Sequence, residues 1–149
     1  MTTQISEFDP TKASKSFFKH GHPGWLGMRF FDYGEDWVEL ELPWRADLQG
    51  EEDQQVIASG PIISLLDMAS GMSIWNAGKV FQPVATLDLR VDYQRPAKAR
   101  SAIIGRSQCY KMTKSAAFVR GMAHDGDPKN PVATMAGVFM KIAMDPRSA

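Results

Sequence analysis

Three features that would indicate a specialised class of protein are scarce in this sequence. The 149 residues include one cysteine, Cys109, which cannot form a disulfide within the chain and reads as a small buried thiol in a strand. Basic and acidic residues number 17 each, so no net charge favours nucleic acid or an anionic membrane. No run approaches the roughly 20 apolar residues of a membrane span, and the N-terminus has neither a basic start nor an apolar run. We expect a cytoplasmic protein without nucleic-acid or membrane partners.

Histidine is also scarce, which argues against a metal site. His20 and His22 lie two positions apart, but only His124 and the single cysteine remain to complete a ligand set. We therefore expect no metal, and we expect the segment 20–23 to be a loop.

The sequence does contain one long helix, in the stretch 58–78. Ser59 or Gly60 is suited to cap its start, Pro61 suits the first turn, and Gly78 suits a left-handed stop. One face of the helical period should form the core, made of Ile62, Leu65, Leu66, Ala69, Met72 and Ser73.

Asp67 lies beside this apolar face and is the only charged residue between positions 61 and 78. No Lys or Arg lies within one helical turn of it. An unpaired carboxylate on a largely buried helix is costly, so we interpret Asp67 as a functional group.

The remaining chain alternates between polar turns and strand-like runs. The runs are 24–31, 37–43, 84–93, 101–111, 115–123 and 132–143. In the run 84–93, Leu87 and Leu89 should face one way and Thr86 the other. The order predicts an α+β fold in which a curved antiparallel sheet of about six strands wraps the helix. We expect a single domain over 24–145, preceded by a polar segment, 1–23, whose composition allows a short helix.

Two motifs resemble a known family. The segment 59–67, S-G-P-I-I-S-L-L-D, resembles the H-G-G-x-x-x-x-L-x-D signature of hotdog-fold acyl-CoA thioesterases, in the branch of the phenylacetate-pathway enzyme PaaI. The segment 86–97, T-L-D-L-R-V-D-Y-Q-R-P-A, is similar to that branch's long strand, which ends in Tyr-x-Arg-Pro-Ala. The resemblance covers roughly residues 24–143 and implies a hotdog fold.

The resemblance also implies roles for individual residues. Asp67 would be the base or the nucleophile, Thr86 would help to hold the water or the carboxylate, and the amides at Ser59 and Gly60 would polarise the thioester carbonyl. The chain departs from the signature where Ala58 replaces its His and Ser59 its first Gly. The Asn that some members have upstream falls near Glu52.

These roles imply a dimer. A helix N-terminus suits a developing oxyanion, but Asp67 lies seven residues beyond Gly60, about 10 Å further along the axis. If both act on one carbonyl, they belong to two chains with antiparallel helices. The resembled family forms homodimers or dimers of dimers, that is, homotetramers.

The substrate would be an acyl-CoA, with no other cofactor. Its phosphates could meet basic residues around the strand turns, namely Arg95, Lys98, Arg100, Lys111 and Lys114. The acyl group could lie against Met68, Met72 and Trp75.

We therefore expect a thioesterase acting on a medium-chain or aromatic acyl-CoA. A hotdog hydratase or dehydratase is a second reading, although no His lies in or just before the helix and the motif 21–23 precedes the first strand. A third is an acyl-CoA-binding module that has lost catalysis, which Ala58 and Ser59 would favour.

Overall fold

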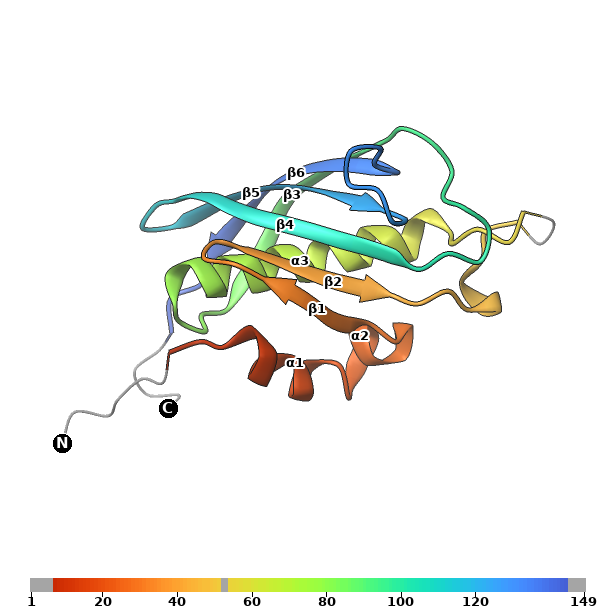
Figure 1. The fold of residues 1–149 in the computed structure, drawn as a ribbon. Coiled ribbons are helices and arrows are strands. Elements are labelled where there is room, and N and C mark those ends of the chain that lie inside the picture. Colours follow the sequence, from red (N-terminus) through yellow and green to blue (C-terminus); the bar gives the residue numbers. More distant parts are fainter. Residues whose placement is uncertain (1–6, 52–53, 145–149) are drawn as a thin grey trace.

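The structure is a computed structural model that describes residues 7–51 and 54–144. Two short helices precede a hairpin, which is followed by one long helix and four further strands (Figure 1). The elements are α1 Pro10–Phe17, α2 Gly21–Leu26, β1 Arg29–Tyr33, β2 Trp37–Leu42, the 3-10 turn η1 Ala46–Leu48, α3 Ser59–Gly78, β3 Val84–Tyr93, β4 Ile103–Met112, β5 Ala116–His124 and β6 Ala133–Lys141.

All six strands belong to one antiparallel sheet with the order β1-β2-β4-β5-β6-β3. The sheet curves around α3, and α1 and α2 lie below β1 in the view of Figure 1. One core of buried side chains joins α3 to the strands. The predicted α+β fold, with a long helix wrapped by six strands, is confirmed.

The long helix α3 has the predicted inner face but different ends. All six residues expected in the core are buried: Ile62, Leu65, Leu66, Ala69, Met72 and Ser73. Ala58 takes the N-cap position without a side-chain bond, so the prediction of Ser59 or Gly60 as the cap was wrong and both are helical. The left-handed residue at the other end is Lys79, with φ of 55°, and not Gly78. Bonds from the amides of residues 79 and 80 to the carbonyls of Asn76 and Trp75 hold that turn. No helix in the described ranges is long and apolar enough to cross a membrane.

The chain before β1 differs most from the prediction. Residues 21–26 form α2 instead of a loop followed by a strand, and β1 begins only at Arg29. Gly27, with φ of 76°, ends the helix and turns the chain into β1. Leu26 and Met28 are buried on either side of this turn, so packing against the core fixes a helix that local composition did not indicate. The domain boundary at residue 24 stays a prediction.

β3 is an edge strand and carries a β-bulge. Thr86 pairs with Phe139 and Asp88 with Val138, which leaves Leu87 as an extra residue. Partners across a sheet share a face, so Thr86 lies on the same face as the buried Phe139, towards α3. The predicted alternation holds for 89–93 but was wrong for Thr86 and Leu87, because the bulge shifts the pleat by one residue.

Candidate active site

Asp67 and Thr86 meet between α3 and β3. The Thr86 hydroxyl donates a hydrogen bond of 2.8 Å to Asp67 Oδ1. Among the described residues, no Lys, Arg or His forms an ion pair with Asp67. The structure thus brings together the carboxylate and the hydroxyl that the resemblance assigns to the site, and it leaves the carboxylate free of a cation.

These two side chains line a cavity of about 320 Å³. Its walls combine a few polar groups with an apolar majority: His22, Pro23, Met28, Ser64, Asp67, Met68, Gly71, Trp75, Val84, Thr86 and Phe139. Asp67, Gly71 and Trp75 follow one another at intervals of four, so they lie along one face of α3. A Cβ at Gly71 would come within 3.9 Å of Trp75 and Val84, so its absence leaves room there. Of the methionines expected here, Met68 lines the cavity and Met72 does not, because it is fully buried in the core.

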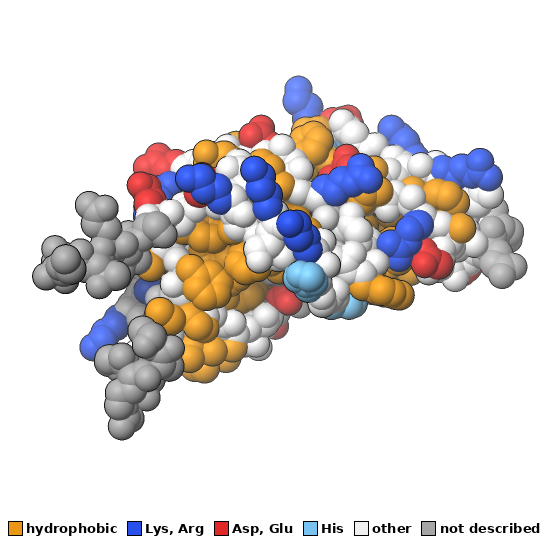
Figure 2. Space-filling view, turned by 90° about the horizontal axis from the view of Figure 1, so that it is seen from below, with side chains coloured by type: hydrophobic (Ala, Val, Ile, Leu, Met, Phe, Trp, Pro, Cys, Tyr) orange, Lys and Arg blue, Asp and Glu red, His pale blue; other side chains and the backbone are white. Residues whose placement is uncertain are grey.

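Trp75, in the wall of this cavity, belongs to an aromatic cluster. The Trp75 ring lies 4.8 Å from Phe81, 5.4 Å from Phe17 and 5.7 Å from Phe8, measured between ring centroids. The Trp75 indole N–H donates to the carbonyl of Gln82 at 2.6 Å. Figure 2 shows hydrophobic side chains gathered beside a row of Lys and Arg side chains on the face that carries α1. The cluster fixes the indole ring at a defined distance along α3 from Asp67.

His22 enters the cavity from α2, and sequence reasoning set it aside. Its Nε2 lies 3.0 Å from Ser64 Oγ, and both residues line the cavity of Asp67. The His22 ring stacks on Trp25 with an interplanar angle of 21°. The motif 21–23 could have pointed to His22, but it was set aside because it preceded an expected strand. Because residues 21–26 form the helix α2 instead, the His22 side chain lies against α3.

A second cavity, of about 400 Å³, lies at the start of α3. It shares His22 and Ser64 with the first and reaches Gly60 at the helix N-terminus. Its lining is His22, Trp25, Leu26, Asp47, Leu48, Gln49, Ala58, Gly60, Pro61 and Ser64. His22 and Ser64 therefore lie where the two cavities meet.

Ser59 faces a third cavity, of about 420 Å³, that Asp67 does not line. The Tyr93 hydroxyl donates to the Ser59 carbonyl at 3.0 Å and thereby ties the end of β3 to the start of α3. Burial raises the pKa of Tyr93 above its ordinary value, which keeps the phenol protonated as a donor. Tyr93 is a second residue near the predicted site to which sequence reasoning gave no role.

Within one chain, Gly60 and Asp67 do not share a cavity. Seven residues of α3 separate them, which amounts to about 10 Å along the helix axis. The amides at the helix start and the carboxylate therefore cannot act on one carbonyl of one chain, which agrees with the geometry expected from the sequence.

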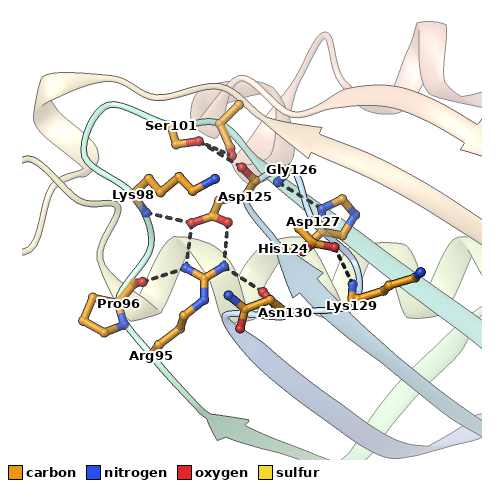
Figure 3. Close-up of polar contacts among 11 residues, drawn as sticks. Arg95, Pro96, Lys98, Ser101, His124, Asp125, Gly126, Asp127, Lys129 and Asn130 are labelled. Carbon is orange, nitrogen blue, oxygen red and sulfur yellow. Dashed lines mark hydrogen bonds and ion pairs between the residues drawn. The ribbon is translucent and has the colours of Figure 1, made fainter.

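Arg95, in the β3–β4 connection, is held in a polar cluster with residues of the β5–β6 connection (Figure 3). Its guanidinium donates to both carboxylate oxygens of Asp125, at 2.7 and 2.8 Å, and to the carbonyls of Pro96 and Asn130. The Lys98 amide donates to the same carboxylate at 2.8 Å. The hydrogen bonds from Arg95 hold the pKa of Asp125 far below its ordinary value, although burial opposes this shift. Both terminal nitrogens of Arg95 are thus engaged within the chain.

The five basic residues expected to meet CoA do not form one cluster, which corrects the sequence interpretation. Arg95 lines a cavity with Ser59 at the start of α3, and the Arg100 guanidinium donates to the side chain of Gln55. Lys111 and Lys114 lie at the opposite end of β4, where Met112 packs against the end of α3 near Gly78. Successive turns of an antiparallel sheet lie at opposite ends, so about 30 Å of helix separates the two groups. Lys98 belongs to the first group. Contact with CoA stays a prediction for all five.

Other reactive side chains lie outside these cavities. Cys109 is buried, and burial raises the pKa of its thiol. His124 is also buried, its Nδ1 accepts a hydrogen bond from the Gly126 amide, and burial lowers its pKa. In residues 7–51 and 54–144, no three His, Cys, Asp or Glu side chains form a group that could hold a metal ion. Glu52, the position nearest the family's upstream Asn, lies outside the described residues.

Several solved structures are similar to this chain. A structure from Pseudomonas aeruginosa is 33% identical, with 78% of this chain and 87% of that chain covered and a TM-score of 0.72. A thioesterase from Haemophilus influenzae has a TM-score of 0.80 at 14% identity, with 93% of each chain covered. The E. coli PaaI protein from the phenylacetic acid degradation operon has a TM-score of 0.75 at 15% identity, covering 94% of this chain and 97% of that one. These similarities confirm the hotdog fold. No curated protein matches the chain.

The family model of the thioesterase superfamily matches residues 54–132, more than half of the chain. The match includes α3 with Asp67 and β3 with Thr86. The chain therefore belongs to the thioesterase superfamily.

Proposed function

We propose that this protein hydrolyses acyl-CoA thioesters, with Asp67 as the reacting carboxylate. The observation that carries the proposal is the Asp67 carboxylate, bonded to Thr86 and not to a cation, at the wall of an otherwise largely apolar cavity. A carboxylate with one hydroxyl partner keeps lone pairs available, and an apolar cavity offers space for an acyl group next to it.

The chemistry needs little beyond a base and an oxyanion site. Asp67 takes a proton from water as the water attacks the carbonyl carbon, or attacks that carbon itself to form an anhydride that water then opens. Thr86 holds the carboxylate or the water in either route. Because the thiol of CoA has a pKa near that of cysteine, about 8.5, the sulfur leaves readily when the carbon–sulfur bond breaks.

The oxyanion would be stabilised by the α3 N-terminus of a second chain. Gly60 and the neighbouring amides carry unpaired N–H groups at the positive end of a helix dipole. In this monomer β3 forms a sheet edge, and Leu87 on it is 61% exposed. An exposed edge strand with an apolar side chain is a suitable surface for pairing with another copy. We therefore infer a homodimer as the active form, or a dimer of dimers.

The acyl group would be a medium-length chain or an aromatic ring. Trp75 lies eight positions after Asp67 on α3, about 12 Å along the helix axis, and the groove between them is lined by Met68, Gly71 and Val84. The length of this groove and its apolar lining suit both a medium-length acyl chain and an aromatic ring. They do not suit a charged acyl group. The nucleotide of CoA would lie towards the basic loop of Lys98 and Arg100.

The experiment is thiol release from short, medium and aromatic acyl-CoAs by the wild type and Asp67→Asn. We expect kcat to fall by about 100-fold or more, in line with the loss of a base. Asp32→Asn is the matched control, because Asp32 lies on β1 at the opposite sheet edge and its one bond, to the Tyr33 amide, survives in asparagine. Binding of the esters without turnover by the wild type would favour a binding module instead.

One observation favours a second candidate function. His22 and Asp67 line one cavity, and a histidine paired with a carboxylate suits a hydratase or dehydratase acting on an acyl thioester. Hydration of an enoyl-CoA, followed by loss of its ultraviolet absorbance, tests this candidate. Thiol release without hydration would exclude it.

A further inference from the structure

His22 lines both the cavity of Asp67 and the second cavity, at the start of α3. It lies 42 positions before Ser64 in the sequence, yet its Nε2 is 3.0 Å from Ser64 Oγ. Ser64 precedes Asp67 by three residues, so the two lie on neighbouring positions of the same helix face, about 4.5 Å apart along the axis. The ring is therefore held close to the reacting carboxylate by a residue of the same helix.

The surroundings of His22 contain a limited set of charged groups. From α3 it faces Asp67, and across the second cavity it faces Asp47. Asp47 is already paired with Arg45, whose Nε lies 2.7 Å from its Oδ1. Lys19, near the end of α1, is the nearest basic residue along the chain. Among the residues that the structure describes, Asp67 is thus the one carboxylate without an ion pair that shares a cavity with this imidazole.

The imidazole of His22 and the carboxylate of Asp67 line the same cavity and suit complementary roles. An imidazole can donate a proton and a carboxylate can accept one, so the two side chains can serve as acid and base in one reaction. In the base route of the proposed hydrolysis, Asp67 takes the proton of water, which leaves the acid position open.

We propose that His22 is the general acid that protonates the departing thiolate, an inference that rests on the proposed thioesterase function. Water adds to the carbonyl carbon and gives one proton to Asp67. The tetrahedral intermediate then collapses: the carbon–sulfur bond breaks, its electron pair moves to sulfur, and sulfur takes a proton from the imidazole of His22, whose Nε2 lies beside Ser64 Oγ in the free protein. The acid product and Asp67 release two protons, and His22 takes one back, so one proton is released per turnover.

The leaving group provides the test. General acid help matters more for a CoA ester than for a thiophenyl ester of the same acyl group, because the aromatic thiol is more acidic and leaves unaided. His22→Gln should lower kcat/KM for the CoA ester by about 10-fold, a modest loss because the thiol of CoA is itself acidic, and for the thiophenyl ester by less than about 2-fold. Asp67→Asn should lower both equally, because both reactions need the base.

His20→Gln is the matched control. His20 is exposed, lies two positions away, and makes no side-chain cap bond to α2, so this variant should hydrolyse both esters at the wild-type rate. His22→Ala adds a second measurement: free imidazole should restore part of its activity on the CoA ester and leave that of the thiophenyl ester unchanged.

Three results would overturn the inference. Equal losses on both esters would make His22 a positioning residue, an unchanged rate in His22→Gln would give it no role, and the absence of imidazole rescue in a folded His22→Ala would exclude proton donation. Failure of the proposed function is distinguishable from all three, because the wild type would then hydrolyse neither ester.

Discussion

Two aspartates of this protein show how differently one side chain can be used. Asp125, beneath the β3–β4 connection, is buried, with its side chain fully covered, and receives hydrogen bonds from the Arg95 guanidinium and the Lys98 amide. Asp67, on α3, has one hydroxyl partner, Thr86, and lines a cavity. The first carboxylate is satisfied by its own chain, and the second retains free lone pairs.

The difference separates a group that holds the fold from a group that is available to a substrate. A buried ion pair contributes little over an apolar pair of the same size, but loss of one partner leaves an uncompensated charge. A carboxylate at a cavity wall contributes little to stability and keeps its reactivity. Strong pKa perturbation marks Asp125 here, so perturbation alone would select Asp125 and not the aspartate that we propose as the reacting group.

The largest effect on stability should follow Asp125→Asn. Neutral asparagine leaves the Arg95 guanidinium without its counter-charge in a partly buried site, so we expect the free energy of unfolding to fall by about 3 kcal/mol. Urea unfolding followed by tryptophan fluorescence measures this. Asp127→Asn serves as control, because Asp127 is exposed and its one acceptor bond, from the Lys129 amide, survives. A loss below about 1 kcal/mol would mean that the cluster is not a structural one.

The same ion pair should make stability depend on pH. The folded-state pKa of Asp125 is depressed, mainly by the hydrogen bonds from Arg95, so its contribution is present above the unfolded pKa of about 3.9 and is lost as the pH falls below it. Between about pH 5 and pH 3, the wild type should therefore lose more stability than Asp125→Asn. Parallel curves for the two proteins in thermal unfolding would contradict the assignment.

A smaller effect is expected at the other aspartate. Thr86→Val keeps the shape of the side chain and removes the hydroxyl that bonds to Asp67, so kcat should fall by about tenfold, or about 1.4 kcal/mol. The free energy of unfolding should change by less than about 0.5 kcal/mol. Thr86→Ser retains a hydroxyl and should recover most of the activity. If serine and valine behave alike, the bond does not serve the reaction.

Much of the fold could be predicted from local pattern. The period of α3 identified its buried face because six apolar or small residues recur at helical spacing, and the strand-like runs predicted the number of strands and their sequence along the chain. The pairing of β3 with β6 at the edge of the sheet was not predicted, because it joins segments far apart in the chain. The isolation of Asp67 among uncharged residues was also visible in the sequence.

The remainder depends on contacts between distant segments. α2 has few helix-favouring residues, and its formation depends on burial of Leu26 against the core. The contact between His22 and Ser64 spans 42 positions and follows from that helix. The basic residues of the turns looked like one cluster because they are close in sequence, but their two turns flank the single strand β4 and therefore lie at its opposite ends.

The bulge at Leu87 makes the site depend on the length of β3 as well as on its composition. Thr86 faces α3 only because Leu87 is accommodated as a bulge. If residues 86–88 paired in a regular pleat, position 87 would face α3 and Thr86 would face outward, although every side chain of the motif would still be present. A relative with the same residues but without the bulge would therefore lack the hydroxyl at the carboxylate, whereas a relative without a residue at position 87 would keep it in a regular strand. In such comparisons, the spacing of residues along the strand carries as much information as a substitution.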